Sequence, residues 1–477
     1  MNHSDGEKRP VAKTMNTRVE KDFLGEMNVP ADAYWGIHTR RAVGNFPLTG
    51  IPVHGALIRA YAVVKKACAF ANGELEYLDD RKTQAIMLAC DEIAEGRLAD
   101  QFPVDALQGG AGTSTNMNLN EVIANRAIEI LGGKKGDYAV VHPLDDVNLH
   151  QSTNDTYPTA LKIAAIRGFR SLSSLIALLQ GAFQRKEKEF AAVVSIGRTE
   201  LQEAVPLTLG AQFSAFAEAA ARDRWRTFKC EERLRVVNLG GTAVGTGLGA
   251  PRRYIFLVIE KLREVTSLGL ARGENVVDPT ANADPFVEVS GMLKAYASNL
   301  IKIAGDLRLL NLLGEIRLPP VQPGSSIMPG KVNPVIAEAA IQAGIVVEAN
   351  DSVITGAVSR GTFQICEFLP LVAHALLGSL DLCSAAARMM TAHIEGIVAD
   401  HDRCAAYADK SPLLVTAFLP LIGYEKAEHL LREFQTSGQT SIREFLAEKL
   451  GRETVARVLS PYALTALGHR DNHENDT

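Results

Sequence analysis

Several features that would mark a specialised class of protein are missing from this chain of 477 residues. No stretch reaches the roughly 18 uninterrupted apolar residues that span a bilayer, and the polar residues 1–14 contain no apolar signal-peptide core. Neither sign of charge forms long runs, and 50 Lys and Arg stand against 55 Asp and Glu, so a surface for nucleic acid is not indicated. We therefore expect a folded cytoplasmic protein that contacts neither a membrane nor nucleic acid.

Cysteine is scarce, and its spacing matches no metal-binding or redox motif. Pairs of histidines at helical spacing, from which many metal sites are built, are also missing, so we expect no metal site. The prediction for the thiols is that they are reduced and mostly buried. The six cysteines are Cys68, Cys90, Cys230, Cys366, Cys383 and Cys404.

The chain is instead rich in helical periodicity, with apolar residues recurring every three or four positions. The pattern predicts helices over residues 59–71 and 82–96, and then a series of unusually long ones. Residues 334–354 are apolar almost throughout, which favours a helix buried nearly all round at the centre of an oligomer. The long helices are predicted over 160–195, 211–239, 285–313 and 333–358, and shorter ones over 425–435 and 441–450.

Two polar loops carry more hydroxyl and amide side chains than a turn or a helix cap requires. The first covers residues 108–118 and precedes a predicted helix over 121–131, where Ser114 or Thr115 could be the N-cap. Its glycines could hold a phosphate, but the strand of a dinucleotide fingerprint and the Gly-Lys ending of a P-loop are both missing. The second covers 151–159, before a long helix. Anion binding at the helix N-terminus and elaborate capping both remain open there.

A third loop, residues 324–334, is the most informative stretch of the sequence. Two glycines and two prolines oppose regular structure, while Ser325, Ser326, Lys331 and Asn333 supply donors just before the apolar helix. Reactive side chains on an irregular backbone are typical of a lid or catalytic loop, although an ordinary surface loop is the alternative. Together the three loops offer donors suited to a small polyanion.

These loops resemble the signature regions of the aspartase/fumarase superfamily, and the likeness runs across nearly the whole chain. The third loop matches the superfamily signature itself. Residues 18–26, 108–126 and 197–206 resemble bacterial aspartate ammonia-lyases more than class II fumarases. The run 151–155 points the same way, because fumarases usually carry a second Ser where Thr153 stands.

The resemblance implies a mainly α-helical fold of three domains. These are an N-terminal domain over 1–151 with a flexible tail over 1–16, a central helical bundle over 152–402 that carries the signature loop 324–334, and a small C-terminal domain over 403–477. It further implies a homotetramer with a twenty-helix core, in which three subunits assemble each active site. The implied reaction is anti elimination of ammonia from L-aspartate to give fumarate without a cofactor, and an activating divalent cation at a remote site stays open.

The resemblance also assigns roles to single residues. Ser325 is implied as the general base that takes the Cβ proton, activated by loop amides when the loop closes over the substrate. Lys331 and Asn333 are implied to hold the α-carboxylate with Thr199, and Asn154 to contact the amino group. Donors must also stabilise the enediolate intermediate. The substrate-binding set implied is Thr113, Ser114, Ser152, Thr153, Asn154, Thr199, Glu200, Ser326 and Asn333, supported by Glu338.

Four positions depart from the usual pattern of the superfamily. Glu200 stands where many relatives have His, and with Glu338 as its expected partner the two carboxylates would share a proton. The loop over residues 309–318 is shorter than usual. In residues 142–148, which form a secondary anion site in fumarases, Asp146 replaces a frequent His and Leu144 a frequent Asn, and Cys366 replaces an Asn. These departures leave fumarate hydratase, a lyase acting on a different amine or acid, and an inactive scaffold as alternatives. Met15 is an alternative start.

Overall fold

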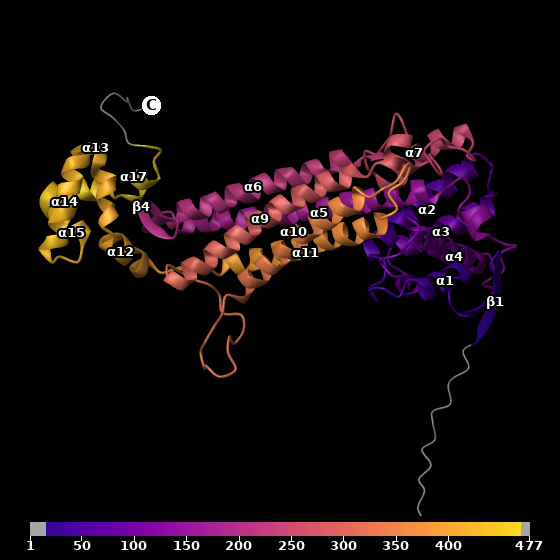
Figure 1. Cartoon of the computed structure of the whole chain (residues 1–477), viewed down its shortest axis with the longest axis horizontal. Helices are drawn as coiled ribbons and strands as arrows, with labels where there is room; N and C mark the ends of the chain where they lie inside the picture. Colours follow the sequence, from indigo (N-terminus) through magenta and orange to yellow (C-terminus); the bar gives the residue numbers. More distant parts are fainter. Residues whose placement is uncertain (1–15, 469–477) are drawn as a thin grey trace, which may run out of the picture. The chain divides into compact units, whose positions relative to one another are not determined.

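The computed structural model of the chain describes residues 16–468 and is built mainly from α-helices (Figure 1). This confirms the mainly α fold class. Most of the predicted tail over 1–16, including Met15, lies outside the described residues, as does the end of the chain over 469–477. The chain divides into two compact units. Unit 1 comprises Met1–Gly168, Cys230–Gly291 and Asn350–Ser379, and unit 2 comprises Phe169–Lys229, Met292–Ala349 and Leu380–Thr477.

Five long helices run through both units. They are α5 (Thr153–Glu189), α6 (Leu209–Leu234), α9 (Asp284–Leu313), α10 (Val335–Val358) and α11 (Leu369–Glu395). The other helices of unit 1 are α1 (Ile37–Asn45), α2 (Gly55–Glu74), α3 (Asp80–Ala94), η1 (Ala99–Gln101), α4 (Thr113–Ile130), the π-helical turn η2 (Pro143–Val147), α7 (Arg252–Thr266) and α8 (Val277–Ala281). Those of unit 2 are α12 (His401–Lys410), η3 (Pro412–Phe418), α13 (Leu419–Ile422), α14 (Tyr424–Ser437), α15 (Ile442–Leu450), α16 (Arg452–Val458) and α17 (Pro461–Thr465).

The described strands form four small two-stranded sheets. In unit 1, β1 (Thr17–Asp22) pairs antiparallel with β2 (Gly25–Pro30), and β5 (Val236–Val237) pairs parallel with β6 (Ala271–Arg272). In unit 2, β3 (Val194–Thr199) pairs antiparallel with β4 (Gln202–Thr208), and β7 (Ile316–Arg317) with β8 (Val398–Ala399). One prediction is wrong here, because the helix expected over 160–195 ends at Glu189 and Ser195 lies in β3.

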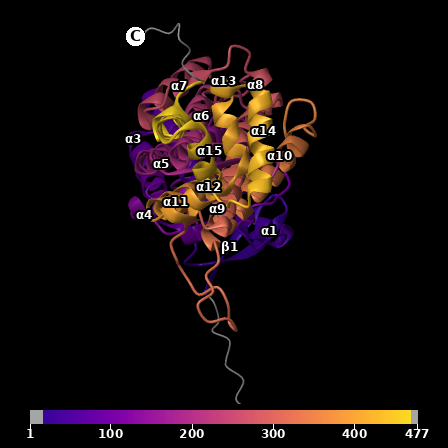
Figure 2. The same cartoon turned by 90° about the vertical axis from the view of Figure 1, so that its left-hand side faces the viewer.

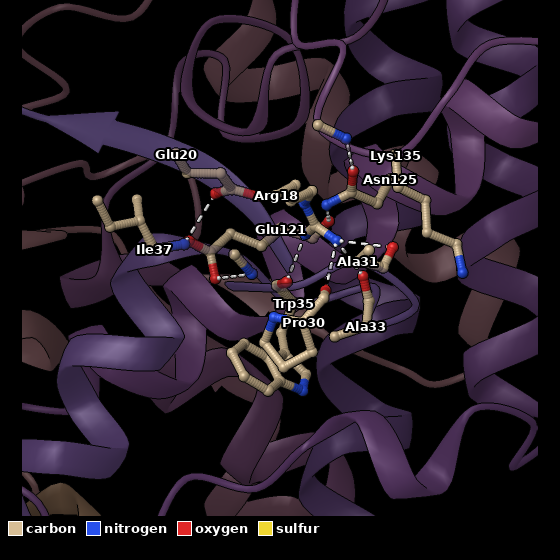
Figure 3. Close-up of polar contacts among 12 residues, drawn as sticks. Arg18, Glu20, Pro30, Ala31, Ala33, Trp35, Ile37, Glu121, Asn125 and Lys135 are labelled. Carbon is tan, nitrogen blue, oxygen red and sulfur yellow. Dashed lines mark hydrogen bonds and ion pairs between the residues drawn. The ribbon is translucent and has the colours of Figure 1, made fainter. Parts of the chain in front are cut away.

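The core of unit 1 is centred on α2, which packs against α3, α4 and α7. Residues all round its circumference are buried, as expected of a helix enclosed by others. The N-terminal hairpin is tied to this core by buried polar groups (Figure 3). Arg18 donates to the carbonyl oxygens of Ala33 and Trp35, and Glu121 on α4 accepts the amides of Gly36, His38 and Thr39 at the start of α1. Burial raises the pKa of Glu121 to about 7.

Parts of the five long helices run side by side in unit 2 (Figure 1). Polar pairs join neighbours along the bundle, including Asn299 on α9 with the buried Asp223 on α6 at 2.9 Å. By length and composition alone α5 and α11 could each cross a membrane, but their most apolar stretches are 44% and 61% buried within the chain. Core helices of a folded protein have this character.

The predicted burial of α10 nearly all round, at the centre of an oligomer, stays a prediction, because a single chain does not test it. One face is buried, but Ile345, Val346 and Val353 are 54%, 46% and 38% exposed. Large apolar side chains exposed along one helix face are typical of a surface that contacts another protein.

The C-terminal helices have a core of their own within unit 2. Phe418 of η3 is fully buried and packs with residues from α14 and α15, including Phe434 and Phe445, whose rings lie 5.5 Å apart. The predicted helices over 425–435 and 441–450 are confirmed as α14 and α15.

Candidate active site

The first polar segment is irregular over 108–112 and then forms the beginning of α4. The helix begins at Thr113, earlier than predicted, and its N-cap is Gly112, whose φ of +92° suits glycine. The predicted capping by Ser114 or Thr115 is therefore wrong, and the hydroxyl of Thr115 donates instead to Gln108 at 3.0 Å. Thr113 is exposed, with its hydroxyl 2.8 Å from the Gly110 carbonyl oxygen.

The second polar segment is likewise the start of α5, which begins at Thr153. Ser152 acts as the cap, because its Oγ accepts the amide of Asn154 at 3.2 Å. Thr153 is only 7% exposed, and the side-chain amide of Asn154 donates to the Ala243 carbonyl oxygen at 2.7 Å. Helix capping explains the presence of Ser152, but it does not explain the polar side chains of Thr153 and Asn154.

The N-termini of α4 and α5 lie against each other within unit 1. The buried hydroxyl of Tyr61 contacts Asn116 Oδ1 on α4 at 2.9 Å and Thr156 Oγ1 on α5 at 2.7 Å. The ring of Tyr157 on α5 lies so close to Gly112 that a Cβ there would come within 2.2 Å of it. Two helix N-termini that carry several hydroxyl groups therefore converge, which is a favourable place for an anion.

A glycine-rich loop that the sequence analysis overlooked supports the second segment. Residues 240–249 hold five glycines in ten positions, a signal that could have been noticed. Their backbone amides at Gly240 and Thr242 donate to the fully buried carboxylate of Asp155, which also accepts the amide of Ser152. Burial raises the pKa of Asp155 to about 7. The three amide donors favour the ionised form and so oppose this rise.

In unit 2, Thr199 and Glu200 lie at the exposed turn of the β3–β4 hairpin. Glu200 and Leu201 form its two central positions with φ of +53° and +61°. Such values normally demand glycine or asparagine and cost roughly 1–2 kcal/mol per residue otherwise. The hairpin is held by a buried ion pair, in which Arg198 donates to both oxygens of Glu315 at 2.8 and 3.1 Å. Strain of this kind tends to persist at functional sites.

The third segment is irregular, as predicted, and projects from the ends of α9 and α10 in unit 2 (Figure 1, Figure 2). Its neck is closed by the amide of Gly324 donating to the Lys331 carbonyl oxygen at 2.7 Å, and by Asn333 Nδ2 donating to Gly324 at 2.9 Å. Within the loop, Ser325 Oγ accepts the backbone amides of Ile327 and Met328 at 3.2 and 3.0 Å. Two amides therefore already point at the oxygen expected to act as base.

The remaining expected residues of unit 2 lie close to this loop in the sequence. Ser326 and Lys331 are exposed, and Glu338 lies in the first turn of α10. Glu338 forms an ion pair with Arg308 of α9 at 3.6 Å, a partner that the sequence analysis did not name. The sharing of a proton between Glu338 and Glu200 stays a prediction.

The expected site residues thus fall into two sets within one chain. Among residues 16–468, no group of three or more His, Cys, Asp and Glu side chains could hold a metal ion. Thr113, Ser114, Ser152, Thr153 and Asn154 belong to unit 1, and Thr199, Glu200, Ser325, Ser326, Lys331, Asn333 and Glu338 to unit 2.

Two of the other departures, at Asp146 and in the loop over 309–318, have structural explanations. Asp146 binds Lys82 through both carboxylate oxygens, at 2.9 and 3.0 Å, and accepts the amide of His142. A carboxylate in this segment does not suit an anion site. The shortened loop is accommodated because α9 continues as far as Leu313. Gly314, with φ of +78°, then turns the chain into β7. Nothing in the structure explains why Cys366, which is buried, replaces an asparagine.

Comparison with known proteins decides the family. The Lyase family model matches residues 25–348, well over half of the chain. The chain belongs to the Lyase family. An aspartate ammonia-lyase of Pseudomonas aeruginosa is 46% identical over 468 residues, covering 96% of this chain and 98% of the relative.

Two solved structures of Lyase relatives share the fold. A fumarate lyase:delta crystallin from Brucella melitensis, bound to cobalt, matches with a TM-score of 0.90 and 45% identity over 94% of this chain and all of that one. A class II fumarase from Schistosoma mansoni matches with a TM-score of 0.86 over 94% of this chain and 98% of that one, but with only 30% identity. The resemblance to the aspartase/fumarase superfamily is therefore confirmed.

Proposed function

We propose that the chain is an aspartate ammonia-lyase, a carbon–nitrogen lyase that removes ammonia from L-aspartate by anti elimination to give fumarate. Curated aspartate ammonia-lyases at 42–47% identity over most of the chain support this substrate. The structural observation that carries the proposal is Ser325, whose Oγ accepts two backbone amides. Those donors stabilise a negative charge on this oxygen, which a serine needs in order to act as a base.

The reaction begins when the oxygen of Ser325 takes the proton from Cβ of aspartate. The electron pair left on Cβ spreads into the neighbouring carboxylate as an enediolate. Thr113, Ser152, Thr153 and Ser326 donate hydrogen bonds to this group, with Ser114 beside them at the start of α4. The pair then forms the Cα–Cβ double bond as the Cα–N bond breaks and ammonia leaves. Closure of the loop over 324–334 excludes water during these steps.

The other polar residues bind the far end of the substrate. Lys331 and Asn333 hold the α-carboxylate together with Thr199, while Asn154 contacts the amino group. Because Asn333 Nδ2 already binds Gly324 at the neck of the loop, its orientation is linked to that of Lys331, whose carbonyl oxygen accepts the amide of Gly324. No cofactor takes part in this scheme.

A homotetramer with each site shared by three subunits fits the distribution of residues. The site residues belong to two separate units of one chain, and the open apolar face of α10, with Ile345 and Val346, is suited to a helix–helix interface. We further propose the three-domain division at 151/152 and 402/403, and a place in the cytoplasm.

The base is tested by Ser325→Ala. Turnover of aspartate should be lost, while circular dichroism and the size of the assembly stay as in the wild type. Ser174→Ala is the matched control, because Ser174 is an exposed serine whose Oγ bonds only its own helix at Arg170. Substantial activity left in the Ser325 variant would remove it as the base.

The unusual Glu200 is tested by Glu200→His. A carboxylate at the hairpin turn repels the α-carboxylate of aspartate when it is ionised, so the change should lower KM for aspartate. An unchanged KM from neutral to mildly alkaline pH would show that Glu200 is neutral or remote from the substrate.

A further inference from the structure

A fully buried lysine lies behind the second polar segment and has no role in the reaction described above. Lys65 on α2 is 0% exposed. Its Nζ donates to Asn148 Oδ1 and to Gln151 Oε1, both at 2.9 Å. Among residues 16–468, no carboxylate forms an ion pair with it. Burial of an ammonium group costs several kcal/mol, so a chain that only needed to fill this space would gain from an apolar residue.

The two acceptors of Lys65 connect it to both polar segments of unit 1. Asn148 Oδ1 also accepts the side-chain amides of Asn116 and Asn120 on α4, each at 3.1 Å. Asn148 Nδ2 in turn donates to the carbonyl oxygen of Gln151, the residue directly before Ser152. A single amide group therefore joins α2, α4 and the start of α5, and in the part of the chain that the structure describes Lys65 is its one charged donor.

The other end of this segment is fixed by a buried charge of opposite sign. Asp155 accepts the amide of Ser152 and those of Gly240 and Thr242. The backbone over 151–155 is thus held between a buried ammonium at Gln151 and a buried carboxylate at its far end. Hydrogen bonds to charged groups are about twice as strong as neutral ones, so these contacts define the positions of the side chains between them.

Several titratable groups surround Lys65. The Tyr61 ring of its own helix lies 5.5 Å from Nζ, Cys68 is on the same helix and Cys90 on α3, and Asp155 faces it from α5. Desolvation lowers the pKa of Lys65 to about 8, and Asp155 opposes that change. Tyr254 on α7 interacts with Cys68 and Asp155, and burial raises its pKa well above the usual value.

We infer that Lys65 is a positioning residue for substrate binding, which acts through Asn148 and Gln151 to hold Ser152, Thr153 and Asn154 in place. This inference rests on the proposed function, because it assigns a use to donors that the reaction requires. Lys65 itself does not touch the substrate.

The test compares Lys65→Met with Lys162→Met. Lys162 is an equally suitable buried lysine, 3% exposed, with its Nζ 2.7 Å from the Val236 carbonyl oxygen and its pKa also lowered by burial to about 8. Both variants replace a buried charge by an apolar side chain of similar length, and the melting temperature of each shows whether it folds. Only the change at Lys65 should weaken binding of succinate, a dianion without an amino group, measured by calorimetry on the intact assembly.

We expect the affinity of Lys65→Met for succinate to fall at least tenfold at pH 7, and kcat/KM for aspartate to fall about 10²-fold, the usual scale for small misplacements of binding groups. Raising the pH through 8 removes the proton of wild-type Lys65, so succinate affinity should also fall between pH 7 and 9. That fall should persist in Lys162→Met and be missing in Lys65→Met. Equal affinity in Lys65→Met and the wild type, or equal losses in both variants, would overturn the inference.

A second variant covers the case in which Lys65→Met does not fold. Asn148→Asp keeps the shape and the acceptor oxygen, but places a carboxylate against Lys65 and removes the bond to Gln151. It should fold and bind succinate at least tenfold more weakly, and wild-type affinity would overturn the inference. The proposed function is judged separately. If the wild type binds succinate but does not convert aspartate, the proposed reaction is contradicted. If the wild type converts aspartate and the variant binds succinate normally, only the role of Lys65 is contradicted.

Discussion

Replacing Glu315 by alanine tests how the hairpin that carries Thr199 is held. The carboxylate of Glu315 is fully buried, accepts the hydroxyl of Ser195, and binds both terminal nitrogens of Arg198 at 2.8 and 3.1 Å. The backbone oxygen of Glu315 accepts the amide of Asp400, which the substitution preserves. The change therefore removes the side-chain contacts of one residue and leaves the local backbone pairing in place.

The expected loss can be worked from burial. The side chain of Arg198 is only 20% exposed, so without Glu315 a mostly buried guanidinium is left without an anion. Removal of one partner from a buried pair costs about 3–5 kcal/mol. Glu395→Ala is the matched control, because Glu395 also binds an arginine, Arg185, but the two side chains are 43% and 58% exposed. Exposed pairs contribute little, and that variant should unfold like the wild type.

Urea denaturation followed by circular dichroism measures both variants. We expect an earlier midpoint for Glu315→Ala alone, together with a raised KM for aspartate, since the strained turn at Glu200 loses its anchor. A Glu315 variant within 1 kcal/mol of the wild type would refute the reasoning about the buried pair, by the usual scale of surface substitutions.

Two further predictions concern packing and reactivity. Gly112→Ala places a Cβ 2.2 Å from the Tyr157 ring. Such overpacking should lower the free energy of unfolding by about 1–3 kcal/mol more than Gly132→Ala does, because at Gly132 φ is also positive but no atom lies within 4 Å of the added Cβ. Equal melting temperatures of the two variants would contradict this. All six thiols are buried, and burial raises the pKa of Cys68 to about 12, so a thiol reagent at pH 8 should react with none before unfolding and with six afterwards. Rapid labelling of the native protein would show an open thiol.

The existence and length of most helices could be predicted from apolar periodicity, as α9 and α10 show, because such a stripe has no stable place except against another surface. The starts of α4 and α5 could not. Polar residues such as Asn116 and Asn120 favour loops by their local preferences, yet here they point inward to shared partners and are buried. Tertiary hydrogen bonds thus override local propensity.

The sequence indicates a candidate site where donors gather without a helical reason, and it gives no signal for Lys65, whose proposed role acts through its neighbours. Lys65 lies beside Lys66 in a mostly apolar helix, and no pattern marks its amine as the buried one, since burial depends on the helices around it. The surroundings of α10 likewise depend on tertiary and quaternary structure. Its sequence reports the total apolar surface to be covered, without saying whether the same chain covers it.

The central claim is tested most directly by following the ultraviolet absorbance of fumarate while the purified protein is offered L-aspartate and L-malate in parallel. The account predicts a rising signal with L-aspartate and none with L-malate. A signal with malate alone would identify a fumarate hydratase, and silence with both would contradict the proposed function and direct the search to other amino-dicarboxylates.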